Sequence, residues 1–271
     1  MKNIYLLILL GFFSQQVFSF STVQEKGYLR VAVYKDYAPF AFREKGKLVG
    51  IEVDLAKLLA AKLNVDPLIW AISADETMED DLRNSVWKGH YIGGGTADVM
   101  LHVPVNKEFA KENDQVVISN PYFKEETVAV RHNSRYSLPL TKLFEDYPIG
   151  VELDTLSDFY LIGAMGGRFR ENVRHYTTVQ LAIEAMEEGA VRSVVGPRSQ
   201  IESALGETAD EYLFSKVSMP LSYQSSWVVG TAIKEGRDEL VAEITKAFEA
   251  LKESGELKAL FKKYNISYIR P

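Results

Sequence analysis

The chain contains no cysteine, which excludes disulfide bonds and a lipid-modified cysteine anchor. It is also poor in histidine, and its four histidines have none of the spacings of a zinc site. A net charge of −6 argues against a nucleic-acid partner. Neither a GxSxG motif nor a phosphate-binding loop occurs. We therefore expect no metal, no cofactor and no catalytic nucleophile.

Long apolar runs are missing except at the N-terminus. Lys2 supplies a positive start and residues 4–13 form an apolar stretch too short to span a bilayer comfortably. Residues 1–19 are therefore predicted to be a signal peptide, cleaved after Ser19 or after Ser21. The alternative, an uncleaved anchor helix, is disfavoured because Gln15 and Gln16 end the apolar run early. We expect an exported protein, without a lipid anchor, in the periplasm of a Gram-negative cell.

A length of 271 residues fits one large domain or two modest lobes. Buried-strand and amphipathic-helix patterns alternate along the chain, which predicts an α/β fold with mainly parallel sheets. Such sheets place ligand sites beyond the carboxyl ends of their strands. The expected strands are 28–33, 68–72, 99–103, 116–119, 127–131, 149–153 and 191–196. The expected helices are 51–63, 77–87, 140–147, 157–165, 179–188, 238–254 and 257–264.

Acidic residues cluster at Glu79, Asp80 and Asp81, which could indicate a metal site. Thr77 has the spacing of a helix N-cap with Asp80 three residues later. Carboxylates in the first turn of a helix are also favoured by the helix dipole. We prefer this capping interpretation because it needs no ligand.

Four segments together resemble a known family: LRVAVYKDYAPFAF with GKLVGIEVDLAKLLAAKL, TADVMLHV, SNPYF, and WVVGTAIK with the closing helices. In this order they are similar to family 3 extracellular solute-binding proteins, the receptors of polar amino-acid importers. The resemblance implies a two-lobed periplasmic binding protein fold (type II), with a ligand cleft between the lobes. It places lobe 1 at residues 24–123 and 227–271, and lobe 2 at residues 124–226. It also implies hinge closure, a monomer, and docking on an inner-membrane ABC permease.

The sequence departs from the family at two of its three ligand clamps. Ala110 stands where an arginine holds the ligand carboxylate, with Lys107 the nearest cation, and Pro197 stands where an aspartate holds the ammonium. A closed pocket cannot hold a zwitterion without paired charges. We therefore expect a small polar solute that is not an ordinary α-amino acid.

The resemblance nominates six ligand-binding residues: Tyr37, His102, Asp154, Thr155, Ser157 and Arg198. Tyr37 has the place of the aromatic residue that stacks on the ligand, and the third clamp corresponds to LDTLS. Three of the six have a structural alternative. Tyr37 could pack at the hinge, His102 could be a structural histidine whose hydrogen bonds are made within the protein, and Arg198 could be a solvated surface arginine.

A second resemblance concerns the unusual segments DDLRNSVWKGHYIGGGTADVMLHVPV and VVGPRSQ. They are similar to accessory proteins of periplasmic quinoprotein (methanol or alcohol) dehydrogenases. That resemblance implies a dehydrogenase or its cytochrome c as partner, docked through residues 88–96, although an inert surface turn explains this loop nearly as well. A third interpretation is an enzyme similar to cyclohexadienyl dehydratase with Glu152 as general acid. The primary expectation is a receptor and not an enzyme.

Overall fold

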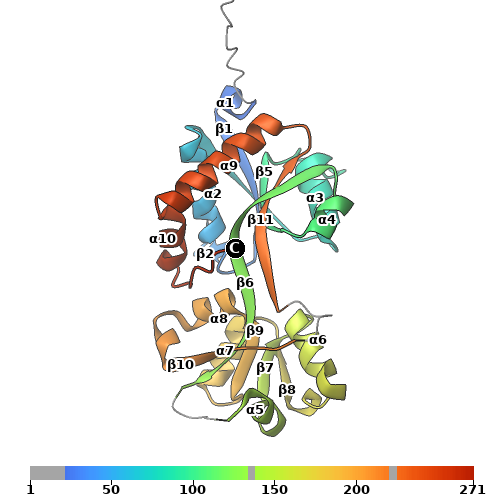
Figure 1. The fold of residues 1–271 in the computed structure, drawn as a ribbon, viewed down its shortest axis with the longest axis vertical. Coiled ribbons are helices and arrows are strands. Elements are labelled where there is room, and N and C mark those ends of the chain that lie inside the picture. Colours follow the sequence, from blue (N-terminus) through green and yellow to red (C-terminus); the bar gives the residue numbers. More distant parts are fainter. Residues whose placement is uncertain (1–21, 134–137, 220–224) are drawn as a thin grey trace, which may run out of the picture.

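The computed structural model describes residues 22–133, 138–219 and 225–271, so the expected signal peptide lies outside the described residues (Figure 1). The strands are β1 (Tyr28–Tyr34), β2 (Phe42–Glu44), β3 (Lys47–Val49), β4 (Asp66–Ile72), β5 (Val99–Pro104), β6 (Val116–His132), β7 (Ile149–Glu152), β8 (Val173–Tyr176), β9 (Ser193–Pro197), β10 (Tyr212–Lys216) and β11 (Ser226–Lys234). The α-helices are α1 (Thr22–Lys26), α2 (Ile51–Lys62), α3 (Met78–Leu82), α4 (Lys107–Glu112), α5 (Leu140–Asp146), α6 (Leu156–Gly163), α7 (Val179–Glu187), α8 (Arg198–Leu205), α9 (Asp238–Glu253) and α10 (Glu256–Lys263). None of these helices is long and apolar enough to cross a membrane.

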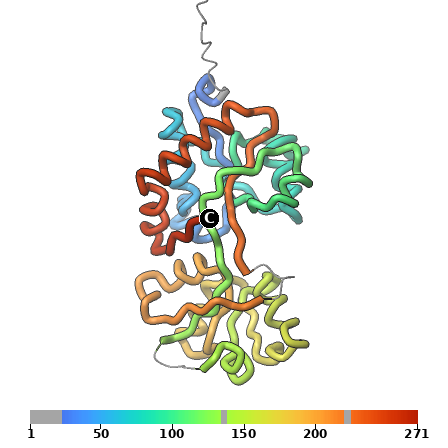
Figure 2. Tube along the Cα trace, viewed as in Figure 1, coloured from blue at the N-terminus to red at the C-terminus, as the bar shows by residue number. Residues whose placement is uncertain are grey.

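The elements gather into two lobes that are linked by β6 and β11 (Figures 1 and 2). The first lobe holds β1 to β5, α1 to α4, α9 and α10. The second lobe holds α5 to α8 and β7 to β10. Hydrogen bonds connect the strands in the order β4-β1-β5-β11-β6-β9-β7-β8, with β10 on the other edge of β6.

Both sheets are mixed, whereas the sequence predicted mainly parallel sheets. β1 pairs in parallel with β4 and β5, and β7 pairs in parallel with β8 and β9. All pairings of β6 and β11 are antiparallel. The difference arises because the two linking strands join the sheets without a helical crossover, which a parallel connection would need.

β6 is one long strand, where the sequence predicted two short ones at 116–119 and 127–131. The pairing with β11 shifts register between Val229 and Thr231, where Pro121 of β6 has no N–H to donate. Gly230 is required at this point, because an added Cβ would lie 2.4 Å from the Ser119 carbonyl oxygen. The bulge lets the strand continue from one lobe into the other.

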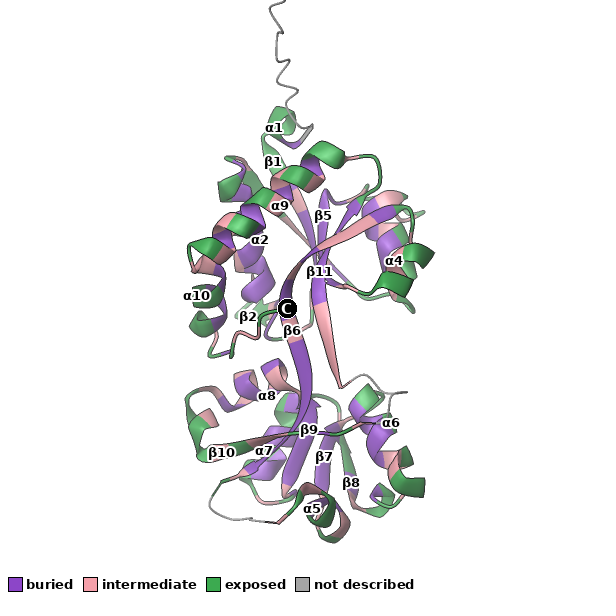
Figure 3. Ribbon diagram, viewed as in Figure 1, coloured by how far each residue is buried: buried purple, intermediate pink, exposed green. Residues whose placement is uncertain are grey.

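Each lobe has apolar cores of its own (Figure 3). In the first lobe, α2, α9 and α10 pack together over the sheet, and a second cluster lies beneath α3. The buried clusters of the second lobe draw their residues from 128–217. The closing helices thus pack on the N-terminal part of the chain. The exact lobe boundaries, 123/124 and 226/227, stay a prediction.

The C-terminal segment, residues 264–271, runs to the linking strands, where the chain ends (Figure 2). Lys124 N on β6 donates to Ile269 O at 3.0 Å. Ser267 N donates to Glu202 Oε2 of α8 at 2.7 Å. The end of the chain therefore contacts both the hinge and the second lobe.

Asp98, which is 3% exposed, ties together three parts of the first lobe. Its carboxylate pairs with Lys26 Nζ at 3.1 Å and Arg237 Nη1 at 2.8 Å, and accepts Arg30 N at 2.9 Å. Burial alone would raise the pKa of Asp98, but these hydrogen bonds and charges outweigh it and hold the pKa below its ordinary value.

We predict that Asp98→Asn lowers the free energy of unfolding by about 2 kcal/mol at pH 7, as measured by urea denaturation. Because the folded pKa is depressed, this stabilisation is present above the unfolded pKa of about 3.9 and is lost as the pH falls through the folded value. The gap between variant and wild type should therefore narrow below about pH 4. The control Asp114→Asn, at an exposed position, should change stability by less than about 0.5 kcal/mol.

Candidate functional site

The carboxyl edges of the two sheets face each other across the hinge. In the first lobe β1, β4 and β5 run parallel to one another. β5 ends at Pro104, which lies beside Val229 near the start of β11. In the second lobe β7, β8 and β9 run parallel to one another, and β9 ends at Pro197, which lies beside Thr127 on β6. Loops at such edges are where α/β folds place ligands.

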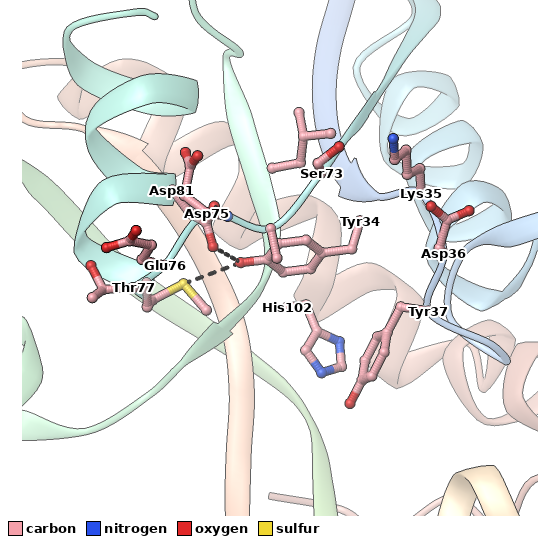
Figure 4. Close-up of a pocket in the computed structure, with 13 residues that line it drawn as sticks. Tyr34, Lys35, Asp36, Tyr37, Ser73, Asp75, Glu76, Thr77, Asp81 and His102 are labelled. Atoms are coloured by element: carbon pink, nitrogen blue, oxygen red, sulfur yellow. Dashed lines mark hydrogen bonds between the residues drawn. The ribbon is translucent and has the colours of Figure 1, made fainter. Parts of the chain in front are cut away.

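A cavity of about 590 Å³ opens at this edge of the first lobe (Figure 4). Its lining comes from the ends of β1, β4 and β5 and from the start of α3. The lining residues are Tyr34, Lys35, Asp36, Tyr37, Ile72, Ser73, Ala74, Asp75, Glu76, Thr77, Met78, Asp81 and His102. The volume suits a small solute.

One wall of the cavity is held by Asp81, at the end of the predicted capping segment. The Tyr34 hydroxyl donates to Asp81 Oδ2 at 2.6 Å, and Asp75 N donates to Oδ1 at 2.8 Å (Figure 4). Burial raises the pKa of Asp81 above its ordinary value. Thr77 caps α3 by accepting Asp80 N, as predicted.

His102 lies at the end of β5 and is held from behind by Glu52 of α2. His102 Nδ1 is 2.6 Å from Glu52 Oε1, and the Tyr122 hydroxyl donates to the same oxygen at 2.5 Å. His102 N in turn donates to Tyr122 Oη at 2.9 Å, with the histidine backbone in the left-handed region (φ 61°). His102 therefore has a fixed orientation in the cavity wall. Burial, followed by the charge of Glu52, raises the pKa of Tyr122 well above its ordinary value.

Tyr37 lies beside His102 in the cavity (Figure 4), with their ring centroids 4.8 Å apart and edge-on. Its other neighbour is Phe40, stacked at 5.4 Å. Burial raises the pKa of the Tyr37 hydroxyl above its ordinary value. Tyr37 and His102 thus share one site, as expected from sequence. Whether they bind a ligand stays a prediction.

Asp154, Thr155 and Ser157 lie together at the carboxyl end of β7 and the start of α6. Thr155 caps α6, accepting Asp158 N at 3.2 Å and donating to Glu152 O at 2.8 Å. Asp154 is exposed and Ser157 is buried. The Thr155 hydroxyl is therefore already engaged in local structure, and a ligand role for these three residues stays a prediction.

Arg198 is placed apart from the cavity that contains Tyr37. Its Nε lies 3.2 Å from Glu202 Oε1, and its guanidinium stacks over the Phe214 ring at 5.1 Å. It lines a different cavity, between α8, β10 and the C-terminal segment. The next residue of α8, Ser199, points elsewhere and donates to Glu125.

Three residues around the site and the hinge were missed from sequence: Glu52, Glu125 and Ser199. Glu125, 2% exposed, accepts hydrogen bonds from the Ser199 hydroxyl and from the Ser199 and Glu126 amides. Burial raises the pKa of Glu125 above its ordinary value. These residues carry no motif. A signal existed only for Glu52, a carboxylate between Ile51 and Val53 in an apolar helix start.

Glu152, nominated as a general acid, is half-buried at the end of β7. Burial raises the pKa of its carboxyl group, the direction that general acid catalysis requires. The enzyme interpretation stays a prediction. No cluster of three or more metal-ligating side chains occurs in the part of the chain that the structure describes.

Residues 88–96, the candidate docking loop, carry two exposed apolar side chains. Tyr91 is 91% exposed and Ile92 is 77% exposed. The loop is anchored by Arg30, whose Nη1 donates to Gly94 O at 2.6 Å while its guanidinium lies over the Trp70 ring.

Comparison with known proteins identifies the class. Residues 29–87 and 93–267 match bacterial extracellular solute-binding proteins, family 3, and the chain belongs to this family. The family match has a gap at residues 88–92, inside the loop described above.

Two curated relatives extend over most of the chain. An arginine-binding periplasmic protein of Mannheimia haemolytica is 22% identical, covering 86% of this chain and 90% of the relative. An L-cystine-binding protein of Escherichia coli (strain K12) is 25% identical, covering 89% and 84%. The names describe the relatives and show no ligand of this chain.

Solved structures share the fold. An ancestral cationic amino acid solute-binding protein superposes with a TM-score of 0.69 at 21% identity, over 89% of this chain and 97% of its own. An amino acid ABC transporter substrate-binding protein from Streptococcus pneumoniae, bound to L-arginine, gives 0.59 at 21% identity over 91% and 98%. The predicted two-lobed α/β fold is confirmed, and the comparisons give no support to the quinoprotein-associated subgroup.

We predict that Tyr122→Phe lowers the free energy of unfolding by about 2 kcal/mol, because it leaves the buried His102 N–H without its acceptor and removes a donor from Glu52. Chemical denaturation monitored by circular dichroism measures the change. Tyr91→Phe, at a fully accessible ring, serves as the matched control and should be neutral. Equal stability of the two variants would contradict a stabilising role for the hydrogen bonds that Tyr122 makes with His102 and Glu52.

Proposed function

We propose that this chain is a periplasmic receptor that binds a small polar solute between its lobes and delivers it to an inner-membrane ABC permease. The observation that carries the proposal is the cavity at the carboxyl edge of the first lobe, the edge that faces the second lobe across the hinge. Family membership supports the receptor role. Export through a cleaved N-terminal segment is part of the same proposal.

The solute is proposed to differ from an ordinary α-amino acid. Within the described lining of the cavity, Lys35 is the only lysine or arginine. Ala110 lies on α4 and Pro197 precedes α8, so neither position supplies a charge. Arg198 is already paired with Glu202. A ligand carboxylate would therefore lack the bidentate partner that usually holds it.

A quinoprotein dehydrogenase partner remains a prediction from sequence alone, and so does a monomeric state. The exposed Tyr91 and Ile92 are compatible with a protein partner at residues 88–96. The receptor proposal does not depend on this loop.

We predict that arginine, lysine, histidine and glutamine bind no more tightly than the high micromolar range. Each lost charged hydrogen bond costs roughly 1.5–3 kcal/mol. Two losses correspond to a weakening of about a hundredfold or more. Isothermal titration calorimetry on the refolded, ligand-stripped protein measures this directly. Low-micromolar binding of any of the four would refute the proposed selectivity.

Native mass spectrometry of protein purified without refolding tests the receptor role itself. We expect a co-purified small molecule, and small-angle scattering should report compaction when that molecule is added back to stripped protein. Absence of any bound solute together with an unchanged scattering profile would refute the receptor proposal.

A further inference from the structure

A buried arginine without a counter-charge lies in the second lobe. Arg131 is 8% exposed and belongs to β6, which pairs with β9 on one side and with β10 on the other (Figure 3). Its Nε and Nη1 atoms are enclosed, yet within residues 22–133, 138–219 and 225–271 they have no hydrogen-bond partner and no carboxylate forms an ion pair with Arg131. A guanidinium stays protonated in a protein. A buried ion of this kind is costly unless an opposite charge accompanies it.

Ser193, the first residue of β9, supplies a second buried polar group next to Arg131. β6 and β9 are antiparallel, with Val130 beside Val194. Arg131 and Ser193 therefore occupy the next position along the two strands, where side chains are cross-strand neighbours. Ser193 is 0% exposed, and its Oγ has no hydrogen-bond partner in the part of the chain that the structure describes.

The surroundings of these two side chains are apolar. Side chains alternate between the two faces of a sheet. Ala129 and Val195 lie two residues from Arg131 and Ser193 on their respective strands, and both belong to the buried cluster that also contains Phe144. The two polar side chains therefore point to the face that this cluster covers. Apolar side chains offer the three unpaired atoms neither a hydrogen-bond acceptor nor a negative charge.

We propose that Arg131 and Ser193 bind a small monovalent anion of the halide class, for which chloride is the probe. The unpaired atoms decide this class. A guanidinium can only donate hydrogen bonds and a hydroxyl can donate as well, so the missing partner accepts them. A water molecule would accept them but leave the positive charge uncompensated, whereas an anion does both. The enclosure of both side chains favours a compact ion over an organic acid.

This anion site lies at the opposite end of β9 from the candidate ligand cleft. Ser193 begins the strand, and Pro197 ends it at the carboxyl edge. Four residues of extended strand span about 13 Å. The anion is therefore separate from the solute, and the inference does not rest on the receptor function. Its expected effect is to stabilise the second lobe.

Urea denaturation at constant ionic strength tests the anion. Sodium chloride is exchanged stepwise for sodium gluconate, whose anion is too bulky for an enclosed site, and urea is used because guanidinium chloride would itself supply chloride. We expect the unfolding equilibrium constant to fall about tenfold between zero and about 150 mM chloride, as for a site that is half-filled near about 15 mM. An equilibrium constant that does not depend on chloride would overturn the proposal.

Two variants locate the effect. Arg131→Met removes the charge but keeps a long unbranched side chain, and it should reduce the chloride response to less than about twofold. Ser193→Ala removes one donor and should give an intermediate response of about threefold. The matched control Arg43→Met removes an exposed arginine of the first lobe and should keep the wild-type response. Equal responses of Arg131→Met and Arg43→Met would refute the assignment to Arg131.

A direct measurement on the wild-type protein covers the case in which Arg131→Met does not fold. Bromide replaces chloride in such sites and scatters X-rays anomalously. Crystals grown in sodium bromide should show an anomalous peak within hydrogen-bond distance of the Arg131 guanidinium and Ser193 Oγ. Bromide bound only at exposed side chains, or a water molecule in place of the anomalous peak, would overturn the proposal.

Discussion

The antiparallel pairing of β6 with β11 is the constraint on which the rest of the molecule depends. It extends from Ser226 beside Glu126 to Lys234 beside Val116, and within the described residues it is the strand pairing that joins β6 to the sheet of the first lobe. Because β6 then pairs with β9 and β10, the direction of one strand fixes the direction of both sheets. The two carboxyl edges consequently face each other, and every candidate ligand group follows from that orientation. A side chain at Gly230 would collide with this pairing.

The electrostatics of the site follow from burial with few cations nearby. Glu52 is fully buried, and its partners His102 and Tyr122 both contact the same oxygen. Glu125 and Glu152 have raised pKa values for the same physical reason, desolvation. Buried carboxylates without full compensation are costly, and such groups concentrate at functional sites.

Much of the fold was predictable because its signals are local. The helix expected at 51–63 is observed as Ile51–Lys62, with Asn64 in the left-handed conformation that ends it. The elements missed from sequence include β8, α8 and β10, whose short or polar segments lack clear periodicity. The continuity of β6 was missed because pairing with β11, more than a hundred residues later, overrides the break that Pro121 would otherwise cause.

The site was less predictable than the fold. The resemblance brought Tyr37 and His102 together, since Tyr37 follows β1 and His102 lies near the end of β5. It did not indicate that Arg198 pairs with Glu202, four residues later on α8, or that its guanidinium lies over the Phe214 ring, which only the tertiary fold brings near. Glu125 was equally invisible, since its importance comes from its contact with Ser199.

The position of the chain end has a practical consequence. Because Ile269 accepts a hydrogen bond from the hinge strand and Ser267 donates to Glu202 of the second lobe, the last residues lie against both the hinge and the second lobe. A purification tag fused after Pro271 would crowd this junction, whereas a small fluorophore attached there would sense changes in the angle between the lobes. The same geometry that restricts fusion partners makes the C-terminus a suitable site for an optical biosensor.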